Sequence, residues 1–300
     1  MRKEYFWLII SGILYGTITA GGQLFVNLGF SLYEITFYRI LSVLILTSLI
    51  ILFRTDLLIR KNQIPFFALY GLIGALLGLT MFGGLIYGVP VSIVALLLYT
   101  QPIWTTILGK YTLDEPVTPR KIVSVIIGIV AVILLFNSWN SDFKGSETGI
   151  LIALAGGFLL SLWIIMGRKS GISNTHFIST IFGWKIFTIL WLILLYPLLN
   201  LITNDPSFVN FRLILPAKFL FGFLAFGLVG GLLPHTLFYS SVKRINASEA
   251  GIILLLEPLS ASIIAIILFN QYLTIQTIFG GLLILVSNYI LLTGKKSVEN

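Results

Sequence analysis

Residues 71–102 read GLIGALLGLTMFGGLIYGVPVSIVALLLYTQP, and residues 227–258 read GLVGGLLPHTLFYSSVKRINASEAGIILLLEP. Laid over each other without a gap, the two stretches agree at positions where apolar composition alone would not make them agree. These pairs are Gly71 with Gly227, Gly74 with Gly230, Thr80 with Thr236, Ser92 with Ser248, and Pro102 with Pro258. Self-similarity at a fixed spacing is the mark of an internal repeat. The sequence therefore predicts a chain built from two copies of one unit.

The rest of the chain is as apolar as this stretch. Of its 300 residues, 57% are hydrophobic and 10% are charged, whereas roughly 25% are charged in an average soluble domain. Mean hydropathy is +1.02, and the apolar residues form runs of about 18–25, the length of a membrane-spanning helix. This composition excludes a soluble enzyme and a nucleic-acid binder. Because there is no cysteine, it also excludes a disulfide scaffold.

Run lengths and helix breakers predict an all-α integral membrane protein with about ten transmembrane helices. The predicted spans are 5–28, 33–53, 65–87, 91–110, 119–137, 148–168, 175–202, 213–241, 247–269 and 274–293. Five spans fall in each copy of the repeat. We expect the first five-helix repeat to occupy residues 1–140 and the second to occupy residues 147–295.

Basic residues predict how the chain lies in the membrane, because Lys and Arg gather on cytoplasmic loops. With a cytoplasmic N-terminus, fourteen bases fall inside: Arg2, Lys3, Arg54, Arg60, Lys61, Lys110, Arg120, Lys121, Arg168, Lys169, Lys243, Arg244, Lys295 and Lys296. Only Lys144, Arg212 and Lys218 fall outside. Both termini are therefore expected in the cytoplasm, in a multi-pass protein of the plasma or inner membrane. A cleaved signal peptide ending near Ala20 is an alternative for the first apolar run.

Matching loops of the two repeats carry opposite charge. The loop after the fourth span has Lys110, Arg120 and Lys121, while its counterpart at residues 270–272 has no base. Before the ninth span the chain carries Lys243 and Arg244, and the matching loop of the first repeat has no base. The repeats are thus predicted to insert in opposite orientations. Inverted repeats are typical of secondary transporters, which bind substrate near the midplane between the two halves.

Three short motifs carry a resemblance to a known family. They are residues 34–39 (EITFYR), residues 113–118 (LDEPVT), and residues 246–250 (NASEA) leading to Leu256-Glu257-Pro258. In this order, the motifs resemble the EamA-like branch of the drug/metabolite transporter superfamily, whose members have paired EamA domains. Gln271 and Ser124 depart from the family pattern, where Glu and Gly are common. The resemblance implies movement of small metabolites, often amino acids or related solutes, by alternating access.

The spans contain few polar groups, and those few are the candidate site. Glu257 lies about ten residues into its span, roughly 15 Å from the end, near the membrane midplane. A carboxylate there is costly and faces a cavity or a partner. In a functional role, Glu257 carries a proton or binds the ammonium group of the substrate. In a structural role, it forms a hydrogen bond that holds two helices together. Gln101 is its uncharged counterpart. Pro102 and Pro258 predict helix breaks at matching positions of the two repeats, which point to a binding site.

Two cations and two rings complete the predicted substrate-binding set. Arg39 and Lys185 lie within their spans, and they are expected to bind an anionic group of the substrate or to balance Glu257. For Arg39, snorkelling to the outer headgroups is the alternative. Trp104 lies one turn from Gln101 and is expected to stack on the substrate or to pack against its neighbours. His235 either shapes the pocket or packs as an ordinary buried histidine.

The sequence thus predicts a secondary active transporter or exporter of small metabolites, with proton coupling as an open hypothesis. It has no phosphate-binding loop and no metalloprotease motif, so we expect no enzyme activity, no cofactor and no metal. The expected partners are a small-molecule substrate and the lipid bilayer, without nucleic acid, in a monomer or a homodimer. Two alternatives remain open: a membrane enzyme acting on lipid-linked substrates, and a passive scramblase or structural subunit.

Overall fold

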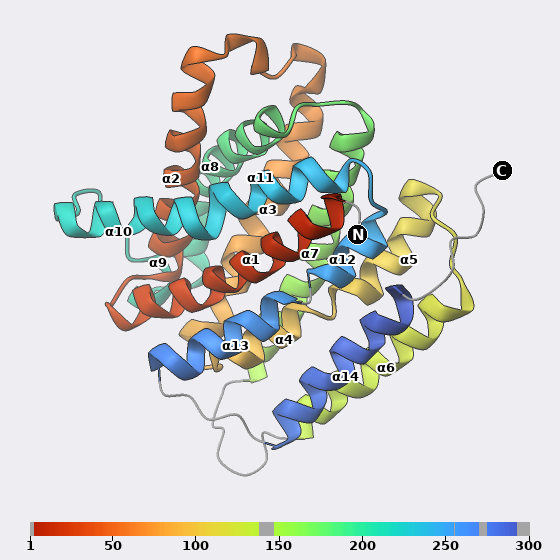
Figure 1. Cartoon of the computed structure of the whole chain (residues 1–300). Helices are drawn as coiled ribbons and strands as arrows, with labels where there is room; N and C mark the ends of the chain where they lie inside the picture. The colour runs from red at the N-terminus through yellow and green to blue at the C-terminus, as the bar shows by residue number, and fades with distance from the viewer. Residues whose placement is uncertain (1–2, 138–146, 255, 270–274, 293–300) are drawn as a thin grey trace.

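The computed structural model describes residues 3–137, 147–254, 256–269 and 275–292. These residues form helices and loops without a strand (Figure 1). The first repeat contains α1 (Lys3–Asn27), α2 (Leu32–Phe53), α3 (Ile64–Ile86), α4 (Val91–Leu98), α5 (Gln101–Leu113) and α6 (Pro119–Asn137). The second contains α7 (Glu147–Ile172), α8 (Phe177–Ile202), α10 (Ala217–Gly227), α11 (Leu233–Val242), α12 (Ala247–Ile253), α13 (Leu256–Phe269) and α14 (Ile275–Leu292). Short turns η1 (Thr55–Leu57), η2 (Lys61–Gln63) and α9 (Pro206–Val209) lie in loops.

Each predicted span overlaps a helix or a pair of helices, so the predicted all-α membrane fold is confirmed. Six helical stretches among the described residues are long and apolar enough to cross a membrane without interruption. The predicted orientation of the termini stays a prediction. Several residues used in the sequence argument lie outside the described residues: Arg2, Lys144, residues 270–274 with Gln271, Lys295 and Lys296.

The fourth and ninth spans are not continuous helices. The fourth divides into α4 and α5 between Leu98 and Gln101, and the ninth divides into α12 and α13 between Ile253 and Leu256. Pro102 stands in the first turn of α5, where its missing N–H leaves the carbonyl four residues earlier without its helical partner. Pro258 takes the corresponding place in α13, and its side chain lies outside the described residues.

The eighth span departs from the prediction at its start and in its middle. Its helix begins at Ala217 rather than residue 213, because Pro216 takes the N-cap and the preceding residues form a loop. Between α10 and α11 the chain passes through one turn of π-helix, η4 (Leu228–Leu232), and Pro234 follows in the first turn of α11. A proline lacks the N–H that would continue the α-helical pattern, and π turns of this kind are frequent at functional sites.

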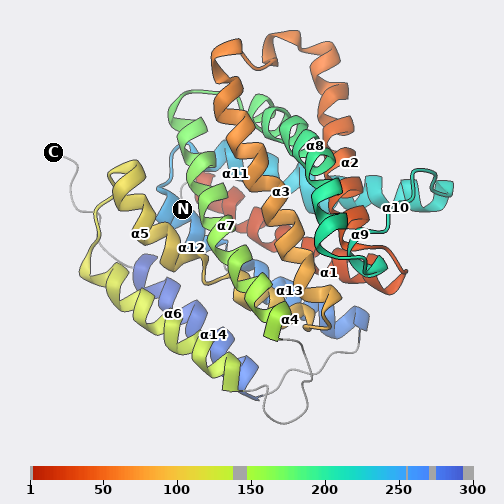
Figure 2. The same ribbon diagram turned by 180° about the vertical axis from the view of Figure 1, so that it is seen from behind.

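The packing of helices follows the pseudo-symmetry of the repeats. The half-helix α4 packs against α13, and α5 packs against α12, so that the two broken spans cross at their breaks. Around them, α1 packs on α11 and α13, just as α7 packs on α3 and on the α4–α5 pair. The last helices of the repeats, α6 and α14, lie side by side at one edge (Figures 1 and 2). The centre of this arrangement is therefore the crossing of the two broken helices.

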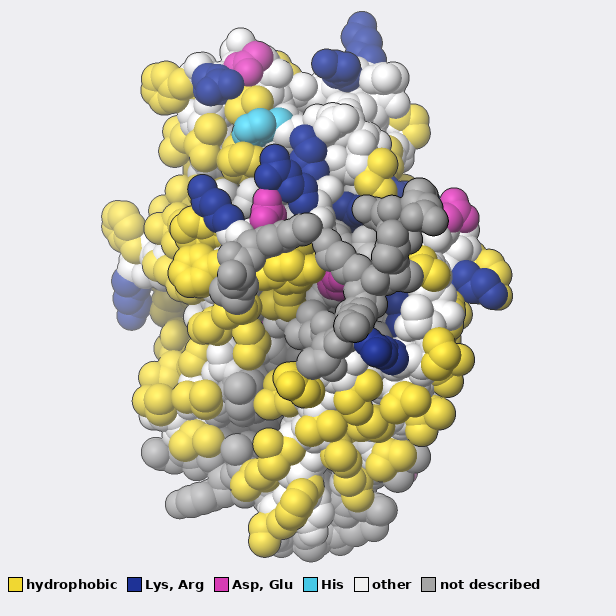
Figure 3. Space-filling model, turned by 45° about the vertical axis from the view of Figure 1, so that its right-hand side comes forward, with side chains coloured by type: hydrophobic (Ala, Val, Ile, Leu, Met, Phe, Trp, Pro, Cys, Tyr) yellow, Lys and Arg dark blue, Asp and Glu magenta, His cyan; other side chains and the backbone are white. Residues whose placement is uncertain are grey.

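The outer surface suits a lipid environment. Large apolar side chains are exposed along several spans, among them Phe53, Leu194 and Phe221. Figure 3 shows apolar side chains covering the lower part of one face, with Lys and Arg gathered in its upper part. A soluble protein does not leave so many large apolar groups exposed.

Candidate functional site

A cavity lies between the repeats, beside the crossing of the broken helices. It encloses about 550 Å³ of space not filled by atoms, part of it open to the outside. Six helices contribute the polar and aromatic side chains that line it. These are Tyr15 of α1, Arg39 of α2, Trp163 of α7, Trp184 of α8, His235 of α11 and Glu257 of α13. Leu98 and Leu254, the residues at the two breaks, also line it. Both repeats thus build one site.

Glycines let the neighbouring helices approach the two breaks. A Cβ atom on Gly157 of α7 would lie 2.9 Å from the Leu97 carbonyl oxygen and 2.5 Å from Thr100 Oγ1. On the other side, a Cβ atom on Gly12 of α1 would lie 3.1 Å from the Ile253 carbonyl oxygen. Each break is therefore covered by the first helix of the opposite repeat.

Glu257 is the acid of this cavity. It is buried, with 5% of its surface exposed, and it lines the cavity from the first turn of α13. Its partner is Tyr99, which lies at the break of the fourth span and donates its hydroxyl hydrogen to Glu257 Oε2. The carboxylate of one repeat is thus held by the broken helix of the other. Tyr99 was not singled out from the sequence, where it is one aromatic residue in an apolar run.

Arg39 is the cation that lines the cavity. Its side chain leaves α2 toward the interior, and 6% of the residue is exposed, so the snorkelling alternative does not describe this structure. The guanidinium carbon lies 5.4 Å from the centroid of the Phe82 ring and 6.0 Å from that of Phe226. Its Nε has no hydrogen-bond partner. Rings on two sides hold the guanidinium in place and leave a donor free.

Aromatic rings form the walls around these charges. The His235 ring lies 5.4 Å from Tyr15, 5.5 Å from Trp163 and 5.4 Å from Trp184, measured between centroids. Behind them, Tyr70 donates or accepts a hydrogen bond with Tyr239, and its hydroxyl lies 3.0 Å from the Trp163 carbonyl oxygen. Sequence reasoning did not identify Trp163 or Trp184, because an apolar span shows no helical face from which their direction could be read.

His235 follows the π turn, which determines its orientation. Its Nδ1 shares a hydrogen with the carbonyl oxygen of Gly231, one turn earlier. A carbonyl oxygen can only accept, so Nδ1 carries the hydrogen, and when the ring is neutral its lone pair lies on Nε2. The histidine therefore offers an acceptor on its other nitrogen.

Three residues of the predicted set do not line the cavity. Gln101 is fully buried, contacts Thr105 through its amide nitrogen, and packs against Gly251 of α12. Trp104 packs edge-on against Phe158, with ring centroids 5.4 Å apart. Lys185 is fully buried and places Nζ 3.7 Å from the centroid of the neighbouring Trp184 ring, which does line the cavity.

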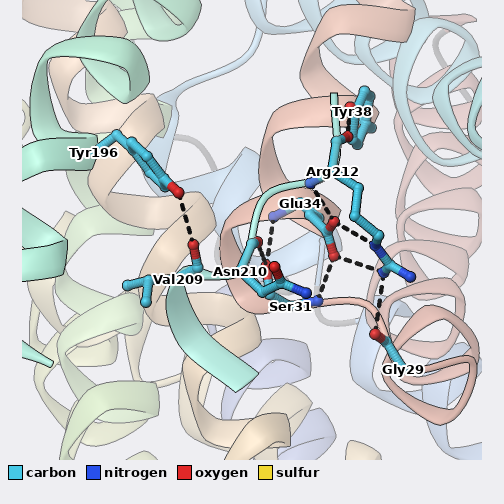
Figure 4. A network of polar contacts seen from close by, with 8 residues as sticks. All are labelled: Gly29, Ser31, Glu34, Tyr38, Tyr196, Val209, Asn210 and Arg212. Atoms are coloured by element: carbon cyan, nitrogen blue, oxygen red, sulfur yellow. Dashed lines mark hydrogen bonds and ion pairs between the residues drawn. The ribbon is translucent and has the colours of Figure 1, made fainter. Parts of the chain in front are cut away.

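A clasp joins the repeats on the face predicted to be extracellular (Figure 4). Arg212, in the loop before α10, binds Glu34 of α2 through Nε and Nη2 at 2.7 Å each, and its backbone N–H adds a third bond at 2.8 Å. The Ser31 backbone N–H donates to the same carboxylate at 2.9 Å, as part of a capping box. We call Gly29, Ser31, Glu34 and Arg212 the outer clasp. The hydrogen bonds to Glu34 raise the pKa of the Arg212 guanidinium above its usual value.

The opposite face has its own contact between the repeats. Glu115, in the loop between α5 and α6, accepts a hydrogen bond from the Ala247 backbone N–H at 2.9 Å and binds the Ser248 hydroxyl. Lys121 lies 3.8 Å from the same carboxylate. A carboxylate at a helix N-terminus is favoured by the helix dipole. The first repeat thus caps α12 of the second.

The sequence profile of the EamA-like transporter family matches residues 2–137 and again residues 147–293. The chain belongs to this family. The EamA-like chain is also similar to a protein of Clostridium kluyveri named an uncharacterized transporter. The two are 22% identical over 312 residues, which covers 100% of this chain and 96% of the relative.

A second relative and a solved structure are also similar to this chain. A protein of Archaeoglobus fulgidus, likewise named an uncharacterized transporter, is 23% identical over 219 residues, or 70% of this chain and 73% of its own. A crystal structure covering 97% of both chains superposes with a TM-score of 0.69 at 14% identity. At that identity the superposition shows similarity of fold alone. The predicted family and membrane transport class are confirmed.

Proposed function

We propose that this membrane transporter is a secondary active transporter, and that it moves a small metabolite by alternating access through the cavity between its repeats. The observation that carries the proposal is the position of Glu257. Its carboxylate faces a cavity at the crossing of two broken helices and is held by Tyr99 of the other repeat. A rocking motion of the repeats would change this contact and the access to the cavity together.

The lining of the cavity supports a small amphipathic substrate. Arg39 offers a free donor for a carboxylate, Glu257 offers an acceptor for an ammonium or a proton, and aromatic rings cover the apolar part. Amino acids have these three parts, and export from the cell is the proposed direction. Glu257 is the proposed group for the coupling proton. Gln101 and Trp104 stay proposals as site residues, because they are buried beside the crossing without lining the cavity.

Reconstituted vesicles test this proposal. Counterflow of labelled amino acids and organic acids is measured with the wild type, with Glu257→Gln, and with Glu147→Gln at the exposed start of α7 as the matched control. We expect protein-dependent flux that Glu147→Gln retains and that Glu257→Gln either loses or makes independent of a pH gradient. Absence of protein-dependent flux for every solute, with turnover of lipid-linked substrates instead, would favour the membrane enzyme and overturn transport.

A further inference from the structure

Three side chains in the cavity wall carry polar hydrogens that the protein leaves unpaired. They are the Tyr15 hydroxyl on α1, Nε of Arg39 on α2 and Nε1 of Trp163 on α7, and each is buried without a hydrogen-bond partner. At most 6% of each residue is exposed. Arginine Nε and indole Nε1 can only donate, and a tyrosine hydroxyl can donate as well. Because buried polar groups are nearly always paired, the three donors indicate a ligand with acceptor atoms.

Contacts within the cavity wall connect the three donors. The Tyr15 ring meets the Trp163 ring edge to face, with centroids 6.3 Å apart. On another side, Trp163 is stacked on Phe238 at 4.9 Å, which holds the indole in place. The Arg39 guanidinium lies within electrostatic range of the Tyr15 hydroxyl. Donors from three helices and both repeats therefore belong to one region of the cavity.

The charges that line the cavity are balanced. In the part of the chain that the structure describes, Arg39 and Glu257 carry the formal charges of the lining, one of each sign. The two act on each other through space, but no direct ion pair joins these described residues. Lys185 packs against Trp184 outside the lining and does not enter this balance. A zwitterion fits between two such charges and leaves neither of them unpaired.

The donors indicate which anionic group of the zwitterion they bind. We propose that Tyr15 and Trp163, together with Arg39, bind the carboxylate of the substrate, while Glu257 binds its ammonium. A carboxylate has two oxygens with about four acceptor positions, enough for three donors, and it carries the single charge that Arg39 balances. A phosphate monoester brings a charge of about −1.5 to −2, which exceeds the charge of Arg39. This inference rests on the proposed function and narrows its substrates to compounds with a free carboxylate and an ammonium.

Binding to the purified full-length protein tests the inference without any flux. The probes are L-leucine and L-leucinamide, which differ in that a neutral amide replaces the carboxylate. A leucine side chain suits the remaining lining, which is apolar: Ile18, Leu77, Met81, Leu98, Leu160 and Leu254. Affinities are measured by calorimetry at pH about 6, where the amine of either probe is protonated.

The variants are Tyr15→Phe and Trp163→Phe, which remove one donor each, and Tyr33→Phe as the matched control. Tyr33 is equally buried, but it lies outside the cavity lining and its hydroxyl donates to the Leu192 carbonyl oxygen at 3.0 Å. We expect the wild type to bind L-leucine about tenfold or more tightly than L-leucinamide, which corresponds to about 1.4 kcal/mol. Tyr15→Phe and Trp163→Phe should each lower this ratio about threefold or more, because hydrogen bonds to a charged acceptor are the stronger ones. Tyr33→Phe should keep the ratio.

Other outcomes overturn the inference. Equal or tighter binding of L-leucinamide, or no saturable binding of L-leucine, refutes the carboxylate site even if vesicles show flux of another solute. An unchanged ratio in Tyr15→Phe and Trp163→Phe refutes their role, also where both affinities fall together, because a purely structural change affects the two probes alike. Should one variant fail to fold, the other variant and the ratio in the wild type still decide. Failure of the proposed function itself is recognised separately, by the absence of flux for every solute.

Discussion

Replacing Arg212 with methionine removes the cation of the outer clasp and keeps a side chain of similar length. The change deletes both guanidinium bonds to Glu34 and the bond from Nη2 to the Gly29 carbonyl oxygen at 3.1 Å. It also removes the guanidinium from above the Phe30 ring, where its carbon lies 4.2 Å from the centroid. Glu34 stays fully buried, with backbone donors from Ser31 and residue 212.

The magnitude follows from the burial of the two partners. Removing one member of a fully buried pair costs about 3–5 kcal/mol, and removing one member of an exposed pair costs about 0–1 kcal/mol. The Glu34 side chain is 0% exposed and that of Arg212 is 40% exposed, so the pair falls between these limits. Two backbone donors also remain. We expect a loss of about 2–3 kcal/mol, or roughly 4–10 °C in Tm.

The chain contains a matched control. Arg54 binds Asp56 through two nitrogens at 3.0 Å each, but both side chains are exposed, 62% and 61%. Thermal unfolding of Arg212→Met and Arg54→Met is followed in detergent by circular dichroism. Arg54→Met should leave Tm unchanged. A shift for Arg212→Met no larger than that of Arg54→Met would refute the reasoning, because burial would then make no difference.

Three further predictions concern other parts of the fold. Gly157→Ala should destabilise the protein by about 1–3 kcal/mol in thermal unfolding, because its Cβ would crowd Thr100, whereas Gly128→Ala, with its nearest neighbour at 3.9 Å, should not. Glu115→Ala should speed amide exchange at the start of α12, and unchanged exchange would contradict the cap. His176, the N-cap of α8, has a pKa lowered by burial and by the neighbouring Arg54 charge. Its contribution to stability is therefore present above its unfolded pKa of about 6.5 and lost as pH falls through the lower folded pKa. Backbone amides at the start of α8 should therefore lose protection from hydrogen exchange at pH about 5. Equal protection at pH about 5 and about 7.5 would contradict this role of His176.

The spans were predictable because apolar run length and proline position are local properties. Residues 71–102 and 227–258 show the repeat directly, and the breaks lie beside the prolines that mark them. The π turn at residues 228–232 was not predictable, because it depends on how α10 and α11 pack on α1 and α2. Helix periodicity also does not show which face of a helix points to the interior when the span is apolar on every side.

The site was predictable by residue type and only in part by position. Glu257, Arg39 and His235 line the cavity, because an ionisable or polar group in a span is directed inward. Gln101 matches Glu257 in the repeat but packs against Gly251, so the symmetry of the sequence does not extend to the chemistry of the site. The Ser31 to Glu34 spacing shows a capping box, while its partner Arg212 lies too far along the chain for a local pattern.

Alternating exposure of the cavity is the central claim, and the absence of cysteine allows a direct measurement. A single cysteine replaces Leu160 in the cavity lining, and another replaces lipid-exposed Leu194 as the control. A charged, membrane-impermeant thiol reagent is then added to either side of oriented vesicles. We predict that Leu160→Cys reacts with the reagent from both sides of the membrane. Added substrate should raise the rate of reaction from one side and lower the rate from the other. Leu194→Cys should react from neither side. Reaction of Leu160→Cys from one side alone under all conditions would contradict alternating access.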